Sequence, residues 1–296
     1  MKKGTVLIFG GSGFLGSYVV DECLSRGYQV VNADMRTSEY TNPDDAYRFV
    51  QSDIMDKDAI QKLVSSIQPH TIYNFAGFAN LDLARHAPLD VCNLNIIGNL
   101  HILEAANANN VQRFIYASSA YAQSKKGSFY GVSKFASEKL IEENFSQNGL
   151  PFSIIRYGSL YGKRADESNG IYRLLRQALD TKKIIHKGSG DEMREYIHAH
   201  DAARLSVDIL EDEKFRNEHI MLTGSERYSQ KELLNMIQEI MNHEIRIESS
   251  SERADGHYLV TPYSFSPTVG IKLTANPFID MGQGIVDCLN HMHSEK

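Results

Sequence analysis

A glycine-rich turn between a strand-like run and a helical pattern constrains the fold of this chain more than any other feature. The turn reads Gly10-Gly11-Ser12-Gly13-Phe14-Leu15-Gly16; it follows the apolar run Thr5–Phe9 and opens a predicted helix over residues 14–26. Glycines spaced as G-x-x-G-x-x-G permit a tight turn and let the backbone approach a pyrophosphate closely. The helix N-terminus then offers free N–H groups and the positive end of its dipole to the phosphates. We therefore expect a dinucleotide to bind at Gly10, Gly13, Phe14, Leu15 and Gly16.

An acidic residue at the end of the second predicted strand indicates which dinucleotide binds. Asp34 follows Gly16 by 18 residues. A carboxylate at this place accepts hydrogen bonds from the hydroxyls of the adenosine ribose and repels a 2′-phosphate. Asp34 therefore predicts NAD rather than NADP. Arg36 weakens this preference slightly, because a nearby arginine can hold a 2′-phosphate, and both residues are candidate cofactor contacts.

The first half of the chain alternates short apolar runs with longer helical patterns. Such runs are typical of strands buried on both faces of a parallel sheet, and Gly27 and Gly149 stand where helices commonly end. Strands are predicted at residues 5–9, 29–33, 47–51, 71–75, 113–117 and 152–157, and helices at residues 14–26, 57–67, 89–109 and 131–148. The alternation predicts an α/β fold with a Rossmann-type doubly wound parallel sheet.

The pattern changes after about Gly162 and becomes less regular. Helices are predicted near residues 171–181, 201–211 and 230–242, with short strands between them. We interpret residues 1–165 as an NAD-binding Rossmann domain, to which residues 190–212 return. Residues 166–296 would form a smaller, partly interleaved C-terminal α/β substrate domain. A crevice between the two would be the ligand site.

Tyr130 and Lys134 form a candidate catalytic pair at the start of a predicted helix. A spacing of four residues puts the phenol and the ammonium on one helix face, where the positive charge would let the tyrosine act as a base at neutral pH. Ser119, at the end of the preceding strand, could hydrogen-bond the same substrate oxygen. A second copy of the pattern, Tyr121 to Lys125, lies in a polar segment without a helical pattern. We therefore predict that Tyr130 carries the proton.

Composition argues against several other classes of protein. The chain has 296 residues, a net charge of -6 and a pI of about 6.0. Proteins that bind nucleic acid or membrane surfaces are usually basic, so neither partner is expected. Cys23, Cys92 and Cys288 are too few and too scattered for a disulfide framework, and no metal-ligand motif is apparent. The N-terminal apolar run is too short for a signal peptide or a membrane span, so we expect a cytoplasmic protein without a metal.

Further segments make nearly the whole chain similar to the NAD-dependent epimerase/dehydratase family, the extended short-chain dehydrogenases/reductases typified by UDP-galactose 4-epimerase. The glycine-rich turn, Asp34 and the Tyr130–Lys134 pair already fit this family. The other segments that resemble its motifs are Ser52-Asp53-Ile54, Asn74-Phe75-Ala76-Gly77, Asn95-Ile96-Ile97-Gly98-Asn99, Arg156-Tyr157-Gly158-Ser159-Leu160-Tyr161-Gly162, and Met193-Arg194-Glu195-Tyr196-Ile197-His198 with Asp201.

The resemblance implies further site residues. Cofactor contacts would come from Asp53, Ile54, Phe75, Ala76, Gly77, Asn95, Tyr130, Lys134 and Tyr157. Substrate contacts would come from Ser118, Ser119, Ser159, Asn169, Arg194 and Arg253. Two departures matter. Gly158 and Ser159 replace the family's usual aromatic residue and asparagine, which alters the sugar pocket, and Ala120-Tyr121 replaces the Asp-Glu pair of the 4,6-dehydratases, which disfavours dehydration.

The resemblance implies an NAD-dependent enzyme acting at C4 of a nucleotide-linked sugar. A 4-epimerase would remove the C4 hydride, rotate the 4-keto sugar and return the hydride to its other face, whereas a 4-dehydrogenase or 4-ketoreductase would stop after one transfer. The rival from another class is a non-catalytic NAD-sensing scaffold, which would have no need of Ser119, Tyr130 and Lys134 together. A homodimer is also expected, through the helices at 89–109 and 131–148, which carry apolar residues beyond the needs of one core face: Leu100, Leu103, Phe135 and Leu140.

Overall fold

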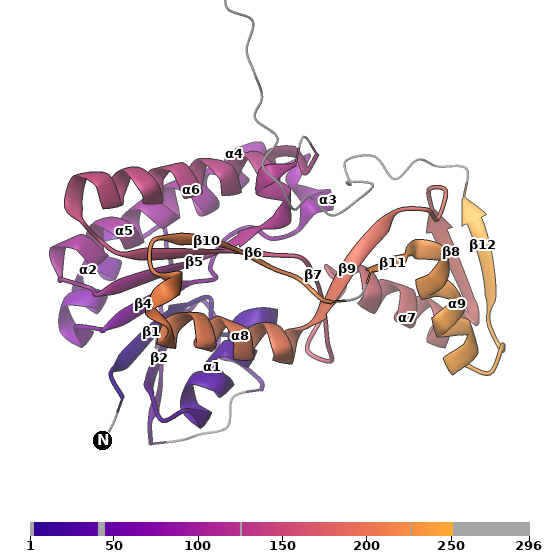
Figure 1. Ribbon diagram of the computed structural model, residues 1–296, viewed down its shortest axis with the longest axis horizontal. Coiled ribbons are helices and arrows are strands. Elements are labelled where there is room, and N and C mark those ends of the chain that lie inside the picture. Colours follow the sequence, from indigo (N-terminus) through magenta and orange to yellow (C-terminus); the bar gives the residue numbers. More distant parts are fainter. Residues whose placement is uncertain (1–2, 41–44, 125, 226, 251–296) are drawn as a thin grey trace, which may run out of the picture. The chain divides into compact units, whose positions relative to one another are not determined.

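A seven-stranded parallel sheet supports the candidate site. The computed structural model describes residues 3–40, 45–124, 126–225 and 227–250. The sheet has the strand order β10-β6-β5-β4-β1-β2-β3, and every pair in it is parallel. Its strands are β1 (Thr5–Phe9), β2 (Gln29–Asp34), β3 (Tyr47–Gln51), β4 (Thr71–Asn74), β5 (Arg113–Ser119), β6 (Phe152–Tyr157) and β10 (Glu218–Leu222). The predicted Rossmann-type α/β fold is confirmed (Figure 1).

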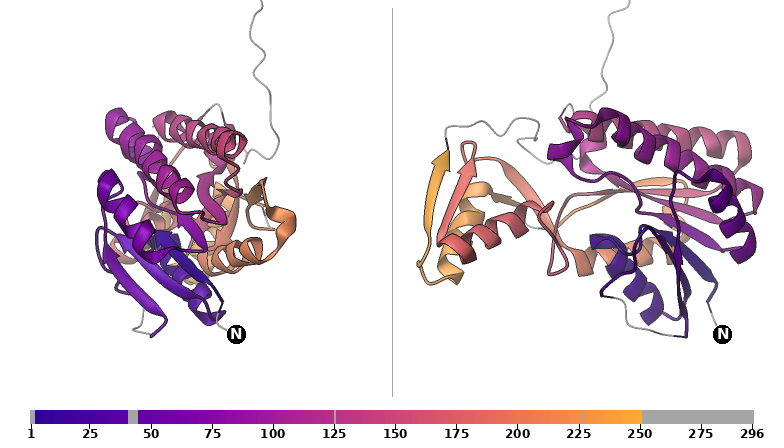
Figure 2. Two further views of the ribbon diagram at one scale, coloured as in Figure 1. Left: turned by 90° about the vertical axis from the view of Figure 1, so that its left-hand side faces the viewer. Right: turned by 180° about the vertical axis from the view of Figure 1, so that it is seen from behind.

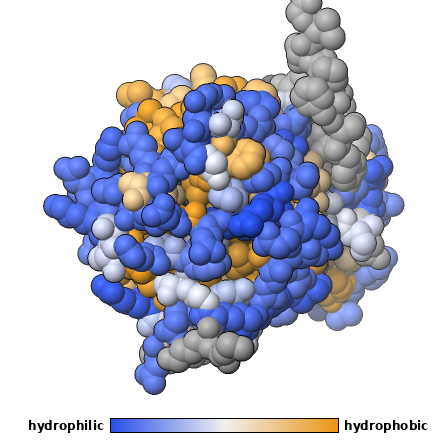
Figure 3. All heavy atoms as spheres, turned by 60° about the vertical axis from the view of Figure 1, so that its left-hand side comes forward, coloured by the Kyte–Doolittle hydropathy of each residue, from blue (hydrophilic) through white to orange (hydrophobic). Residues whose placement is uncertain are grey.

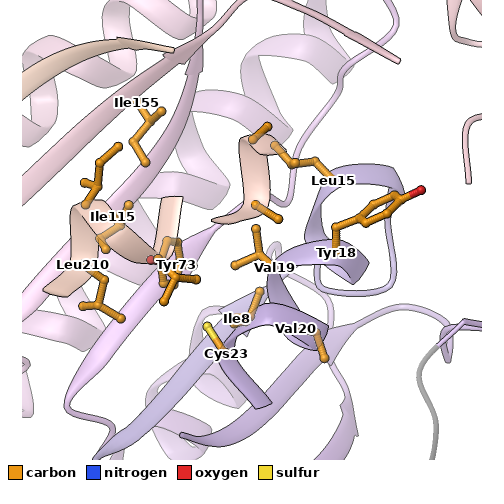
Figure 4. Close-up of a cluster of buried hydrophobic side chains, with 14 of the residues drawn as sticks. Ile8, Leu15, Tyr18, Val19, Val20, Cys23, Tyr73, Ile115, Ile155 and Leu210 are labelled. Atoms are coloured by element: carbon orange, nitrogen blue, oxygen red, sulfur yellow. The ribbon is translucent and has the colours of Figure 1, made fainter. Parts of the chain in front are cut away.

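Helices cover both faces of this sheet (Figures 1 and 2). On one face α1 (Phe14–Ser25) packs with α8 (Ala199–Glu211), and the buried cluster between them and the strands includes Ile8, Val19 and Tyr73 (Figure 4). On the other face lie α2 (Lys57–Ile67), α5 (Gly98–Ala108) and α6 (Ser128–Asn148). The central strands are apolar at nearly every position because both of their faces are buried.

The helix predicted over residues 89–109 is divided in the structure. It consists of α4 (Pro88–Cys92), a π-helical turn η1 (Asn93–Ile97) and α5. A π-turn releases backbone carbonyls from the regular ladder, and the carbonyl of Asn95 accepts a hydrogen bond from the Ser137 hydroxyl at 2.7 Å. The division therefore depends on a contact with α6, which local sequence patterns do not reveal.

Smaller sheets follow β6. Strands β7 (Ser159–Tyr161), β9 (Met193–His198) and β11 (Arg227–Ser229) form one, and β8 (Lys183–Lys187) pairs with β12 (Arg246–Ser250). Helices α7 (Gly170–Thr181) and α9 (Gln230–Ile240) enclose a separate apolar cluster around Ala178, Ile184 and Leu234. The remaining short helices are α3 (Leu81–Ala84), η2 (Ala120–Gln123) and η3 (Glu213–Phe215).

The described residues all belong to one compact unit. Helix α8 packs on the main sheet, and β10 joins its edge although it lies beyond the range of 190–212 that we expected to return. The domain boundary at residue 165 stays a prediction. None of the helices in the described part of the chain is long and apolar enough to cross a membrane.

Candidate active site

The glycine-rich turn has no room for a side chain at Gly10 or at Gly16. Gly10 has φ +80°, and a Cβ atom there would lie 2.5 Å from the backbone nitrogen of Ala76. A Cβ atom on Gly16 would lie 2.1 Å from the carbonyl oxygen of Gly10, because α1 packs directly on the turn. Gly13 is the N-cap of α1, and no side chain caps this helix. The first N–H groups of α1, at Phe14 and Leu15, are therefore left to a ligand such as a phosphate.

Asp34 is tied to this turn. One oxygen of its carboxylate accepts the Ser12 backbone N–H at 3.0 Å, and the other accepts the Arg36 N–H at 3.4 Å. Asp34 is only partly exposed, whereas the Arg36 side chain is exposed. The carboxylate thus lies where the end of β2 meets the turn, which is the place predicted from the sequence.

The loop after β4, residues 75–78, lies against the glycine-rich turn and is hydrogen-bonded to the side chain of Asn95. The amide oxygen of Asn95 accepts the Phe78 N–H at 2.7 Å, and its nitrogen donates to Phe78 O at 3.1 Å and to the Ser133 hydroxyl at 2.8 Å. Gly77, at φ +143°, has no room for a Cβ atom because that atom would lie 2.4 Å from the amide oxygen of Asn95. Asn95 is 2% exposed. It thus fixes the Phe75–Gly77 loop, which is how we expect it to serve a cofactor.

The remaining predicted cofactor residues differ in how much of their side chain is already engaged. The Asp53 carboxylate accepts the Met55 N–H at 2.9 Å and is exposed, while Ile54 is buried beneath Gly98. Tyr157 is buried, and its hydroxyl shares a hydrogen bond of 2.7 Å with Ser206 on α8. Tyr157 can therefore offer a ligand its ring rather than its hydroxyl.

Ser119, Tyr130 and Lys134 are brought together at the carboxyl end of β5. Tyr130 and Lys134 are one turn apart on α6, and the Lys134 ammonium lies 5.9 Å from the centre of the Tyr130 ring. The ammonium also donates to Ala117 O at 2.9 Å and lies 4.8 Å from the centre of the Tyr116 ring. Burial lowers the pKa of Lys134 to about 8.

Tyr121 lies in a regular turn that the sequence pattern did not predict. We expected an irregular polar segment, but residues Ala120–Gln123 form the 3₁₀ turn η2, because the Ser119 hydroxyl accepts the Tyr121 N–H at 3.2 Å and caps it. The Tyr121 ring meets the Tyr130 ring edge-on at 6.4 Å. Gly127 leaves space for it, since a Cβ atom there would lie 2.8 Å from the Tyr121 ring. Lys125 lies outside the described residues.

A cavity of about 700 Å³ opens beside the catalytic candidates. Ser119, Tyr121 and Tyr130 line it together with the predicted substrate residues Ser159, Asn169 and Arg194. Asn169 also caps α7, because its side-chain oxygen accepts the N–H groups of Ile171 and Tyr172 at 3.0 and 3.1 Å. Its amide group donates to Leu160 O at 2.8 Å, so little of it is left for a ligand.

Of the predicted substrate residues that the structure describes, Ser118 lies away from the cavity. Its hydroxyl donates to the buried carboxylate of Glu138 at 2.5 Å. The physical reason is strand alternation, since adjacent residues of β5 point to opposite faces and Ser119 takes the cavity side. The prediction for Ser118 is corrected accordingly. Arg253 lies outside the described residues.

The sequence reasoning missed several polar and charged residues of the cavity wall. Asp82 of α3 and Arg85, which ends α3, line it, as do Arg173, His186 and Glu192. Arg173 forms an ion pair with Asp82 at 3.4 Å. The position after a central parallel strand was a usable signal for Asp82 and Arg85, but no local pattern indicates that Asp82 pairs with Arg173 of α7. Among the described residues, no three His, Cys, Asp or Glu side chains gather to hold a metal ion.

Comparison with known proteins gives a consistent result. The model of the NAD dependent epimerase/dehydratase family matches residues 6–223. A putative UDP-glucose 4-epimerase of Methanocaldococcus jannaschii is 25% identical over 97% of this chain and 98% of its own length. A UDP-N-acetyl-alpha-D-glucosaminuronate decarboxylase of Bacillus cytotoxicus is 25% identical over 83% of each chain.

A solved structure shows the same fold. UDP-glucuronic acid 4-epimerase of Bacillus cereus, in complex with UDP-glucuronic acid and NAD, aligns with a TM-score of 0.79 over 90% of this chain and 95% of its own. The two sequences are 23% identical. The matching relatives thus share the architecture, while their reactions differ.

Proposed function

The chain belongs to the NAD dependent epimerase/dehydratase family, and on that premise we propose that it is a nucleotide-sugar 4-epimerase. One observation supports the proposal above others. Ser119, Tyr130 and Lys134 lie together, and the first two line a cavity whose wall also holds Arg194. A base and a proton-orienting hydroxyl face the space where a sugar would lie, and a guanidinium in the same wall is suited to bind a diphosphate.

The residues around the glycine turn fit NAD. Because Gly10 and Gly16 have no side chains, a ligand can approach the backbone of the turn closely. The start of α1, which has no side-chain cap, offers N–H groups to a pyrophosphate. We assign the adenosine ribose to Asp34, with Arg36, Asp53 and Ile54 nearby. The carboxylate, already held by the Ser12 N–H at 3.0 Å, would repel a 2′-phosphate. When bound, NAD supplies the hydride acceptor for the reaction.

In the proposed reaction Tyr130 removes the proton from the C4 hydroxyl of the sugar. Tyrosine has an ordinary pKa near 10, so the phenolate needs a neighbouring cation, and the Lys134 ammonium lies beside the ring at 5.9 Å. Ser119 orients the same oxygen. Its hydroxyl accepts the Tyr121 N–H at 3.2 Å, which leaves its own proton for the substrate. After the 4-keto sugar has rotated and the hydride has returned to the other face of C4, Tyr130 returns the proton to the C4 oxygen.

We assign the nucleotide diphosphate to the part of the cavity wall that holds two arginines. Arg194 lines the cavity from β9, and Arg173 lines it from α7. Ser159 replaces an asparagine usual in this family, so we propose that it leaves more room around the sugar. Asn169, which caps α7, would act by placing this helix rather than through a strong contact of its own.

A 4-dehydrogenase or 4-ketoreductase remains the second candidate. Its hydride transfer at C4 would be the same as the first step of an epimerase, so the same residues would serve both. A panel of UDP-, GDP-, CDP- and dTDP-sugars separates the candidates. Products would be followed by NMR and reduced nicotinamide by its absorbance. A 4-epimer formed without net reduction of cofactor supports the proposal, stoichiometric reduction supports the second candidate, and no turnover with intact NAD binding supports the sensing scaffold.

We further propose that the protein forms a homodimer through α6. Phe129, Val132 and Phe135 are 44%, 65% and 38% exposed on its outer side, and hydrophobic residues gather along the upper edge of the surface in Figure 3, where α6 lies. Leu103, which we expected to contribute, is buried in the core under α5 instead, and Leu100 packs on that core. A monomer in sedimentation at micromolar concentration would contradict the dimer.

A cytoplasmic location belongs to the same proposal. Cys23 and Cys92 are free thiols, and Cys23 is buried. Free thiols are usual where glutathione and thioredoxin keep cysteines reduced. Fractionation of the cells that make the protein tests the location, and recovery in a secreted fraction would contradict it.

A further inference from the structure

The proposed mechanism requires a cation in a place that disfavours one. Lys134 is 5% exposed, and its ammonium has one backbone acceptor, Ala117 O at 2.9 Å. Burial lowers its pKa to about 8, and the charge of Glu138 acts in the opposite direction. The neighbouring aromatic groups, Tyr116 and Tyr130, are titratable and do not carry the counter-charge when they are neutral.

Glu138 lies one helical turn beyond Lys134 and is fully buried. Its first oxygen accepts the Ser118 hydroxyl at 2.5 Å and Arg156 Nε at 2.9 Å. Its second oxygen accepts Arg156 Nη2 at 2.7 Å and lies 3.4 Å from the amide of Gln123. A carboxylate with four donors from three elements is held in one place and in one rotamer.

The arrangement continues outward from Arg156. Its Nη2 lies 2.8 Å from Nδ1 of His219 on β10, and Nε2 of His219 lies 2.9 Å from the Glu142 carboxylate. Burial lowers the pKa of His219, and the Arg156 charge adds to this. His219 therefore accepts from Arg156 as a neutral ring and donates to Glu142. The chain of contacts thus runs from solvent at Glu142 to the buried Glu138.

We propose that Glu138 is a positioning residue of the reaction: it keeps Lys134 charged and beside Tyr130, and Ser118 and Arg156 hold it for that purpose. Glu138 does not line the cavity, so it would not touch a substrate bound there. Residues four apart on a helix have Cβ atoms about 5–6 Å apart, and the charge of Glu138 raises the pKa of Lys134 against the effect of burial. This inference rests on the proposed function, in which Tyr130 needs the lysine cation.

A structural role alone would not explain the choice of residues. A buried ion pair can often be replaced by apolar side chains without loss of stability, because burying two charges is costly. Here one member of the pair lies a single turn from the catalytic lysine, on the same helix face. Removing Glu138 would take away the carboxylate that binds Arg156 and whose charge favours the ammonium form of Lys134, and this loss would favour the neutral amine.

The experiment measures the pKa of Lys134 directly by NMR titration. The protein with bound NAD is labelled with lysine carrying ¹³C at Cε, and the Lys134 signal is assigned with Lys134→Arg. We expect Glu138→Gln to lower the pKa of Lys134 by about one to two units and to move the acid limb of the kcat/KM profile to higher pH. Arg156→Gln should raise the lysine pKa, because it removes the competing cation. Glu142→Gln, the matched carboxylate one turn further along, should change neither.

Opposite shifts in Glu138→Gln and Arg156→Gln support the proposal, whereas a structural role would lower stability without moving the lysine signal. An unchanged Lys134 pKa in Glu138→Gln, or an equal shift in Glu142→Gln, overturns it. If Glu138→Gln does not fold, the Lys134 pKa is measured in Arg156→Gln instead. A lysine pKa that does not rise in this variant overturns the proposal. The NMR titration needs no substrate, so failure of the sugar panel would refute the proposed function without affecting this test.

Discussion

Replacing Lys134, the lysine proposed to be catalytic, should make the protein more stable while it makes the enzyme inactive. Lys134 is 5% exposed and must carry a charge in a buried place. Lys134→Met keeps an unbranched side chain of similar length and removes the charge. To isolate the lysine, both proteins compared should carry Tyr130→Phe, so that the neighbouring phenol does not titrate.

The expected magnitude follows from the lysine pKa. It falls from the ordinary 10.5 to about 8 in the folded protein, mainly through burial. One unit of pKa corresponds to about 1.4 kcal/mol, so the charged form costs about 3 kcal/mol of folding free energy at pH 7. The lost hydrogen bond to Ala117 O offsets about 1 kcal/mol of the gain. We expect Lys134→Met to raise the free energy of unfolding by about 2–3 kcal/mol at pH 7.

The pH dependence has a definite sign. Between pH 8 and 10.5 the unfolded chain binds more protons at Lys134 than the folded chain does. The free energy of unfolding of the protein that retains Lys134 therefore rises with pH over this range. The advantage of Lys134→Met should therefore be constant below pH 8 and should disappear by about pH 10.5. Urea unfolding of cofactor-free protein across this range measures it. A methionine variant that is less stable at pH 7, or an advantage that does not change with pH, would refute the reasoning.

Four further predictions concern the cofactor site, the base and the dimer. Asp34→Ala should weaken the preference for NAD over NADP, measured by titration calorimetry with both; a preference of the unmodified protein for NADP would point to Arg36 instead. Gly16→Ala should abolish NAD binding, because the added Cβ atom would lie 2.1 Å from a backbone oxygen; undiminished binding would show that the turn can open. Tyr130→Phe should reduce turnover by at least about 100-fold with NAD binding intact, whereas Tyr121→Phe should cost far less; the reverse order would show that the wrong tyrosine was chosen. Val132→Glu should shift sedimentation toward monomer, and an unchanged dimer would exclude the α6 face.

The glycine turn, the position of Asp34 and strands β1 to β6 of the main sheet could be predicted because their signals are local, whereas β10 was not predicted. A strand, a glycine-rich turn and a helix without a side-chain cap follow one another within Thr5–Ser25. The same holds for the Tyr130–Lys134 pair, since helical spacing alone puts them on one face. These features depend little on contacts from distant parts of the chain.

Other features depend on contacts that the sequence does not display. The π-turn at residues 93–97 is stabilised from α6 by Ser137, 42 positions from Asn95. The ion pair between Asp82 and Arg173 joins residues 91 positions apart. The short strands β7 and β11, of three residues each, exist through their pairing with β9. Ser118 was a different case, because strand alternation already indicated that only one of Ser118 and Ser119 could face the cavity.

The central claim is that hydride leaves C4 of a nucleotide sugar and returns to the same carbon. The most direct measurement uses the sugar nucleotide identified by the panel, labelled with deuterium at C4, in buffered H₂O with unlabelled NAD. We expect the 4-epimer to form with deuterium still on C4, and Tyr130→Phe to suppress its formation. Loss of the label to solvent would mean that a proton rather than a hydride leaves the carbon. Inversion at another carbon with C4 untouched would equally contradict the account.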